Sequence, residues 1–106
     1  DIGQGVVTSD ILFRDERCFV VRDIHPLAPT HLLIIPFLHI ISLGQVGTGQ
    51  EPIFGHLLAV AAEMARREGV DQSGYRLSIN QGPDSGQGIP HVHVHLLGGK
   101  TLPELG

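Results

Sequence analysis

The stretch "HVHVHLLGG", residues 91–99, decides the fold prediction. Apolar residues alternate in it with three histidines, which is the period-2 pattern of a strand whose two faces meet different surroundings. On such a strand the histidines share one face, spaced by about 6.6–7 Å, and the apolar residues face the core. The histidines are His91, His93 and His95, and the apolar residues are Val92, Val94 and Leu96.

Three further strands are predicted in the first part of the chain. Apolar runs at residues 11–13 and 18–23, separated by a polar turn, predict a hairpin. The continuous apolar run "HLLIIP", residues 31–36, predicts a strand buried on both faces, which Pro36 ends. The segment after it is ambiguous, with room for one helical turn at residues 40–43.

The hydrophobic period changes in the second half of the chain. Between Pro52 and Glu68 apolar residues recur at helical spacing, and Gly69 suits the end of a helix. Residues 75–80 return to alternation and predict a strand, with Tyr75, Leu77 and Ile79 on its buried face. The order of elements predicts an α+β fold, with an antiparallel sheet of about five strands and one main helix.

Composition bounds the class of protein. The 106 residues suffice for a single small domain, taken here as residues 1–106, with 42% hydrophobic and 17% charged residues, an ordinary globular composition. The net charge of −4 argues against a broad nucleic-acid footprint, and no apolar run approaches the roughly 18–20 residues of a membrane span. The single cysteine, Cys18, suits a core position, and a cytoplasmic location is expected.

The run of histidines has three interpretations. It can be a solvated sheet face. It can bind a metal ion through two imidazoles of a His-x-His pair, completed by His39 or Asp23. It can also carry a neutral imidazole that attacks phosphorus and forms a phosphoramidate, which water then hydrolyses. In that case the glycine-rich loop "GPDSGQG", residues 82–88, offers backbone N–H groups to the phosphate oxygens.

Two longer blocks carry a family resemblance. "NQGPDSGQGIPHVHVHLLGGK", residues 80–100, and "RDIHPLAPTHLLIIPFLHI", residues 22–40, resemble the sequence signatures of the histidine-triad (HIT) family. The likeness extends over nearly the whole chain from about Ile11. Asn80 and the "LLGGK" that ends the first block are similar to the Hint branch, the purine nucleoside phosphoramidases, rather than to the Fhit branch of dinucleoside polyphosphate hydrolases.

The resemblance implies a fold, a reaction and catalytic roles. It implies a HIT fold that forms a homodimer through its helix, and a hydrolase of nucleoside phosphoramidates or related nucleoside monophosphate conjugates that needs no metal and no cofactor. His93 would attack the α-phosphorus and become nucleotidylated, and His91 would orient it through its backbone carbonyl. His95 would donate hydrogen bonds to phosphate oxygens, and His39 would support the triad from a strand end.

The resemblance also implies a substrate site for a purine nucleotide, AMP- or GMP-like, with no nucleic-acid or membrane partner. Asp23 would accept hydrogen bonds from the ribose hydroxyls. Gly88 stands where many Hint proteins carry a serine whose hydroxyl contacts the leaving-group side of the phosphate. Two alternatives therefore stay open: a low-turnover nucleotide-binding or scaffold module, and a metal-binding protein. The remaining substrate residues would be Asn80, Gly86 and Gln87 around the phosphate, and Ile24, Phe13 and Leu12 around the base.

Overall fold

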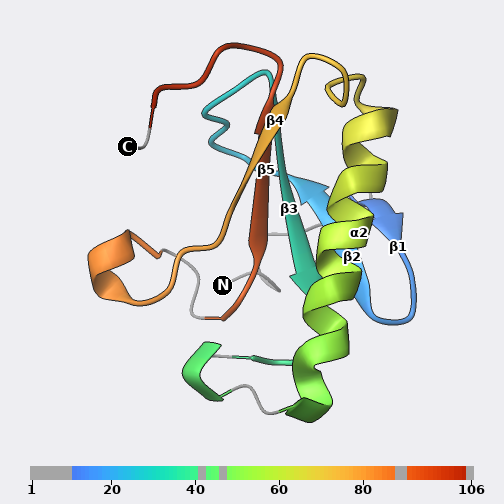
Figure 1. Cartoon of the computed structure of the whole chain (residues 1–106), viewed down its shortest axis with the longest axis vertical. Helices are drawn as coiled ribbons and strands as arrows, with labels where there is room; N and C mark the ends of the chain where they lie inside the picture. Colours follow the sequence, from blue (N-terminus) through green and yellow to red (C-terminus); the bar gives the residue numbers. More distant parts are fainter. Residues whose placement is uncertain (1–10, 41–42, 46–47, 88–90, 105–106) are drawn as a thin grey trace.

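The predicted hairpin and the histidine strand are parts of one antiparallel sheet. The computed structural model describes residues 11–40, 43–45, 48–87 and 91–104. Within them, five strands lie in the order β1-β2-β3-β5-β4, and the helix α2 runs along one face of this sheet (Figure 1). The predicted α+β architecture is confirmed. The bounds are β1 Ile11–Arg14, β2 Cys18–Arg22, β3 Thr30–Pro36, α2 Glu51–Arg67, β4 Tyr75–Ser78 and β5 Val94–Gly98, with the short 3-10 helices η2 Leu43–Gln45, η3 Thr48–Gln50 and η4 Pro83–Ser85.

The central strand β3 separates two apolar clusters. All seven of its residues are buried, as the continuous apolar run predicted. Leu32 and Ile34 pack beneath α2 in the main core, which we call the helix-face cluster. Leu33 and Ile35 point the other way and form a smaller far-face cluster with Val21. Each fully buried aliphatic side chain contributes about 1.5–3 kcal/mol to folding, so the helix-face cluster dominates the stability of the fold.

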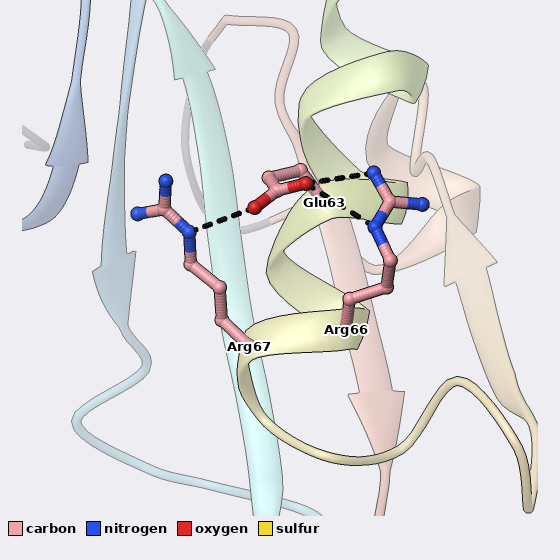
Figure 2. Close-up of polar contacts among 3 residues, drawn as sticks. All are labelled: Glu63, Arg66 and Arg67. Carbon is pink, nitrogen blue, oxygen red and sulfur yellow. Dashed lines mark hydrogen bonds and ion pairs between the residues drawn. The ribbon is translucent and has the colours of Figure 1, made fainter.

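Helix α2 begins and ends where the sequence predicts. Pro52 lies in its first turn, and Gly69, with a φ of 74°, follows its last turn in a conformation that side chains disfavour. Near the C-terminal end Glu63 binds both Arg66 and Arg67, at 2.7 Å and 3.0 Å (Figure 2). These pairs are exposed and add little stability. No helix in the described segments is long and apolar enough to cross a membrane.

The turn between β1 and β2 is tied to α2 through one carboxylate. Asp15 Oδ1 accepts hydrogen bonds from the backbone N–H groups of Arg17 and Cys18, at 2.7 Å and 2.8 Å. Asp15 Oδ2 lies 2.6 Å from Nε2 of His56 on α2. Burial raises the pKa of Asp15, but these hydrogen bonds outweigh it and lower the pKa to about 2. Cys18 is fully buried, as predicted.

Strand β4 departs from the predicted pattern. It ends at Ser78, and only Leu77 packs against the helix-face cluster. Tyr75 and Ile79 are 37% and 38% exposed, so the prediction that they lie on a buried face is wrong. The reason is position in the sheet: β4 is an edge strand, whereas α2 packs on β3 and β5. The alternation of apolar and polar residues correctly predicts a strand. It does not show that this strand lies at the edge of the sheet, whereas α2 packs on β3 and β5.

The helical turn predicted at residues 40–43 falls partly outside the described residues. Ile40 is buried in a loop, and its carbonyl accepts a hydrogen bond from the backbone N–H of Val92 at 2.6 Å. The 3-10 helix η2 begins only at Leu43. The loop after β3 is therefore anchored beside the segment that carries the histidines.

Candidate active site

The histidines lie on the face of the sheet opposite α2. Strand β5 begins at Val94, so His91 and His93 precede it and His95 is its second residue. His95 pairs in register with Leu33, a member of the far-face cluster, and cross-strand partners point to the same side of a sheet. The intervening apolar residues are buried, as predicted: Val92, Val94 and Leu96.

His93 is held in one orientation by its own chain. Its Nδ1 lies 2.9 Å from the backbone oxygen of His91, and its side chain is almost wholly buried. A carbonyl oxygen can only accept, so Nδ1 of His93 carries the proton and donates it to His91. The lone pair of the neutral ring is then on Nε2. The geometry therefore leaves one defined nitrogen free to attack.

A chain of hydrogen bonds orients His95. The backbone N–H of Leu27 donates to Nδ1 of His31 at 3.0 Å, so that nitrogen must carry the lone pair. Nε2 of His31 then holds the proton and donates it to Nδ1 of His95, 2.9 Å away. It follows that His95 carries its own proton on Nε2. The backbone thus makes His95 a hydrogen-bond donor at the site.

Electrostatics agree with these neutral rings. Burial first, and then the neighbouring rings of His93 and His31, lower the pKa of His95 to about 4, while Asp23 opposes the shift. Burial also lowers the pKa of His31, again against the carboxylate of Asp23. Both imidazoles are therefore neutral near pH 7, as the hydrogen bonds require.

Within the described segments, His39 contacts the triad through the ring of His91. The two rings stack with centroids 4.9 Å apart and planes 20° from parallel, and His39 itself is exposed beyond the end of β3. Burial lowers the pKa of His91, with His39 and then His93 adding to the effect. Nδ1 of His91 is buried without a hydrogen-bond partner among the described residues. His39 thus lies where it can support His91.

Asp23 lies beside the catalytic candidates. Its Oδ1 accepts a hydrogen bond from the backbone N–H of His25 at 2.8 Å, and its Oδ2 lies 3.4 Å from Nε2 of His31. Its side chain keeps 18% of its surface exposed, which leaves room for a ligand. Ile24 follows it and is 72% exposed. The structure therefore places Asp23 beside His31, while Ile24 is exposed next to it in the chain.

The prediction that Leu12 and Phe13 line a slot for the base is wrong. Both pack against the helix-face cluster, and Arg67 of α2 lies over the ring of Phe13 at 5.3 Å. The register between β1 and β2 shifts between Ile11 and Phe13, and such an irregularity breaks the strict alternation of faces. Ile11 instead packs on the far-face cluster, the side that carries His95.

The glycine-rich loop offers fewer donors than predicted. Gly86 has a φ of 81° and closes η4, with its N–H donated to the first carbonyl of that helix at 3.1 Å. Gln87 Oε1 accepts from the N–H of Gly82 at 2.7 Å, and its Nε2 is buried without a partner among the described residues. Among the described residues of this loop, Gln87 thus has a side-chain donor that is available to a ligand. Asn80 is half-buried beyond β4, and Gly88 lies outside the described residues.

Two groups of possible metal ligands occur in the described part of the chain. Their donor atoms lie within 4.8 Å of one another. Neither group contains two histidines of a His-x-His pair, which the metal-binding interpretation requires. In each group hydrogen bonds or close polar contacts already link the members. The groups are Asp23, His31 and His95, and Asp15, Cys18 and His56.

Sequence reasoning missed His31. Its position in an otherwise apolar, buried strand is the available signal, because a buried polar side chain needs a hydrogen-bond partner. The sequence does not show which partner it finds.

Comparisons with known proteins agree with this geometry. The HIT domain profile matches residues 4–102. The chain is 43% identical over 96 residues to the purine nucleoside phosphoramidase of Escherichia coli strain K12, which covers 91% of this chain and 81% of that protein. A HIT family hydrolase from Legionella pneumophila Philadelphia 1 superposes with a TM-score of 0.88 at 39% identity, covering 96% of this chain and 91% of the other. A histidine triad protein from Clostridium difficile gives a TM-score of 0.89 at 35% identity over 99% and 91%. The family resemblance of the sequence is confirmed, and the chain belongs to the HIT family.

Proposed function

We propose that the protein hydrolyses nucleoside 5′-phosphoramidates, or related conjugates of a nucleoside monophosphate, through a covalent intermediate on His93. The observation that carries the proposal is the 2.9 Å contact from Nδ1 of His93 to the carbonyl oxygen of His91. It makes Nε2 of His93 a nucleophile of fixed direction. The name of the Escherichia coli relative, purine nucleoside phosphoramidase, supports the same reaction.

In the first step Nε2 of His93 attacks the α-phosphorus. A phosphorus–nitrogen bond to the imidazole forms while the bond from phosphorus to the substrate amine breaks, and the amine leaves with a proton taken from solvent. The ring becomes positively charged, and the carbonyl of His91 stabilises that charge through the hydrogen bond to Nδ1. Nε2–H of His95 is a donor for the phosphate oxygens, where negative charge develops.

In the second step water attacks the same phosphorus. The bond from phosphorus to Nε2 of His93 breaks, the nucleoside monophosphate is released, and the ring returns to its neutral form. The proton that water loses balances the one that the amine took up, so the two steps together consume one water molecule. Neutral His93 with its proton on Nδ1 is both the starting and the final state.

The substrate would lie across the far face of the sheet. Asp23 would accept hydrogen bonds from the ribose hydroxyls, because a carboxylate offers two acceptor oxygens to a diol. Ile24 and Ile11 would contact a purine base, since Ile24 is exposed beside Asp23 and Ile11 packs on the far-face cluster. Gln87 Nε2 would bind a phosphate oxygen and so satisfy a buried donor.

Rapid quenching with adenosine 5′-phosphoramidate, followed by mass spectrometry of peptides, tests the proposal. We expect an adenylyl group on the peptide that contains residues 91–97, located at His93. His93→Ala should show no adduct, whereas His25→Gln, a change at an exposed histidine, should keep it. An adduct on another histidine would refute the assignment. Nucleotide binding without any adduct would favour the low-turnover binding module.

We further propose a homodimer that uses α2 and a reducing, cytoplasmic location. Leu58 of α2 is 47% exposed, so the helix retains apolar surface after covering the sheet. Cys18 is the single cysteine of the chain and is buried, which suits a protein that forms no intrachain disulfide. Light scattering coupled to gel filtration tests the dimer, and Leu58→Glu should shift it toward monomer.

A further inference from the structure

We propose that Asp23 is a positioning residue for the His31–His95 pair as well as an acceptor for the ribose. The inference rests on the proposed function and deepens it, because it makes one carboxylate serve both substrate recognition and the catalytic histidines.

The two oxygens of Asp23 meet different donors. Oδ1 accepts the backbone N–H of His25 at 2.8 Å. Oδ2 lies 3.4 Å from Nε2 of His31, the same nitrogen that lies 2.9 Å from Nδ1 of His95. The side chain of His31 is only 2% exposed, so this contact is poorly screened by water.

The carboxylate of Asp23 favours one of the two possible positions of the proton on the ring of His31. The backbone N–H of Leu27 requires a lone pair on Nδ1 of His31, which places the proton on Nε2. A negative charge facing Nε2 favours the same tautomer and fixes the plane of the ring. His31 then donates to Nδ1 of His95, which leaves His95 with its proton on Nε2, directed to the phosphate. Asp23 thus acts through His31 on His95, which donates a hydrogen bond to the phosphate.

An amide cannot replace this carboxylate. Asn at position 23 has one acceptor oxygen, whereas Asp23 presents one oxygen to the N–H of His25, which donates to it, and the other to the protonated Nε2 of His31, 3.4 Å away. Either orientation of the amide therefore places an NH₂ group against one of these donors. Asp23→Asn keeps the size of the side chain and removes one acceptor, which makes it the informative substitution.

The kinetic test uses a substrate analogue that lacks the ribose hydroxyls, so that Asp23 has no hydrogen bond to the ribose. Wild type and Asp23→Asn are each assayed with adenosine 5′-phosphoramidate and with its 2′,3′-dideoxy analogue. If Asp23 acts only on the ribose, the two proteins will hydrolyse the dideoxy analogue equally well, and the proposal is wrong. We expect Asp23→Asn to be about tenfold slower on this analogue, with the loss in kcat rather than KM, a factor equal to about 1.4 kcal/mol.

A control variant guards against a general effect of losing a carboxylate. Asp71→Asn makes the same change at an exposed position between α2 and β4, away from the histidines. It should match wild type on both substrates. A slower rate in Asp71→Asn on the dideoxy analogue, equal to that of Asp23→Asn, would overturn the proposal because the effect would then not depend on His31.

A measurement without substrate separates this inference from the proposed function. Imidazole ¹⁵N spectra of the free protein should show His31 and His95 protonated on Nε2 in wild type. Asp23→Asn should shift the signals of both rings and leave those of His56, on the other face, unchanged. Unchanged His31 and His95 signals would overturn the positioning role even in an active enzyme. Shifted signals in a protein that hydrolyses neither substrate would instead refute the proposed function alone.

Discussion

Nε2 of His31 lies 2.9 Å from Nδ1 of His95, although 64 positions separate the two residues in the chain. The pairing of β3 with β5 brings them together on the far face of the sheet. The backbone N–H of Leu27 donates to the other nitrogen of His31 and favours a proton on Nε2 in both rings, as does the carboxylate of Asp23 in the role proposed above. A site whose donors are preset in this way needs little rearrangement when negative charge develops on a phosphate.

His31→Phe should slow turnover about 10- to 100-fold, because His95 loses the partner that sets its tautomer and its plane. Phenylalanine fills a similar volume, so the core should stay packed. The N–H of Leu27 loses its acceptor, which should destabilise the fold by about 1–3 kcal/mol. Steady-state kinetics and urea denaturation measure the two effects. Full activity in a folded His31→Phe protein would show that His95 needs no such partner.

Stability should fall as the pH drops from about 6.5 toward 4. The folded-state pKa of His95 is about 4, against 6.5 without the burial and neighbouring imidazoles, and the pKa values of His31 and His91 shift in the same direction. In this window the unfolded chain binds more protons than the folded one, so the free energy of unfolding rises with pH. The contribution is complete above about 6.5 and is lost as the pH falls through about 4.

Urea midpoints at about pH 7, 5.5 and 4.5 measure this dependence. The variant His95→Gln removes the buried histidine whose pKa is lowered to about 4 and should flatten the curve. Asp15 does not contribute in this range, because its pKa of about 2 makes it a source of acid destabilisation only below about 3.8. A midpoint that stays constant down to about pH 4.5 would contradict buried, neutral histidines.

Asp15→Ala should destabilise the protein by about 2–3 kcal/mol, since it leaves the N–H groups of Arg17 and Cys18 and the ring of His56 without their acceptor. Asp15→Asn keeps the oxygen that accepts the two N–H groups and should cost less. Chemical denaturation of the two variants gives the comparison. Equal losses would mean that the tie to His56, rather than the turn, supplies the stability.

Local patterns predict the elements of this fold well. The apolar run at residues 31–36 corresponds to β3, and the helical period corresponds to α2, because both depend on neighbours that are close in sequence. Strand β5 is predicted for the same reason, although it begins at Val94 and carries only His95 of the three histidines, and the contact of His93 with His91 spans only two residues. The hydrogen bond between His31 and His95 cannot be predicted from local patterns, because it depends on which strands pair in the sheet.

The wrong predictions share that cause. The family resemblance implies that Leu12 and Phe13 contact the base, but both pack on the helix face, beside a register shift between β1 and β2. Tyr75 and Ile79 alternate like buried residues, yet Tyr75 lies on the edge strand β4 and Ile79 follows its last residue. Register and strand order are properties of the assembled sheet, and a single sequence carries no direct record of them.

Replacing Gly98 and Gly55 by alanine should change the free energy of unfolding in opposite directions. A Cβ at Gly98 of β5 would lie 3.0 Å from Cβ of Val70 and 3.2 Å from each of its methyl carbons. Val70 is buried in the helix-face cluster and has little room to yield, so Gly98→Ala should cost about 1–3 kcal/mol. A Cβ at Gly55 of α2 would meet no described atom within 4 Å, and Gly55→Ala should stabilise the helix by about 0.5–1 kcal/mol.

Urea denaturation of both variants measures these changes, with activity as a second reading. Because Gly98 lies on the strand that carries His95, three residues beyond it, Gly98→Ala should also lower turnover if the strand shifts to relieve the contact with Val70. Unchanged stability in Gly98→Ala would mean that Val70 moves freely and that β5 is not held against the end of α2. A destabilised Gly55→Ala would instead reveal that this exposed part of the helix is covered in solution, as a dimer through α2 requires.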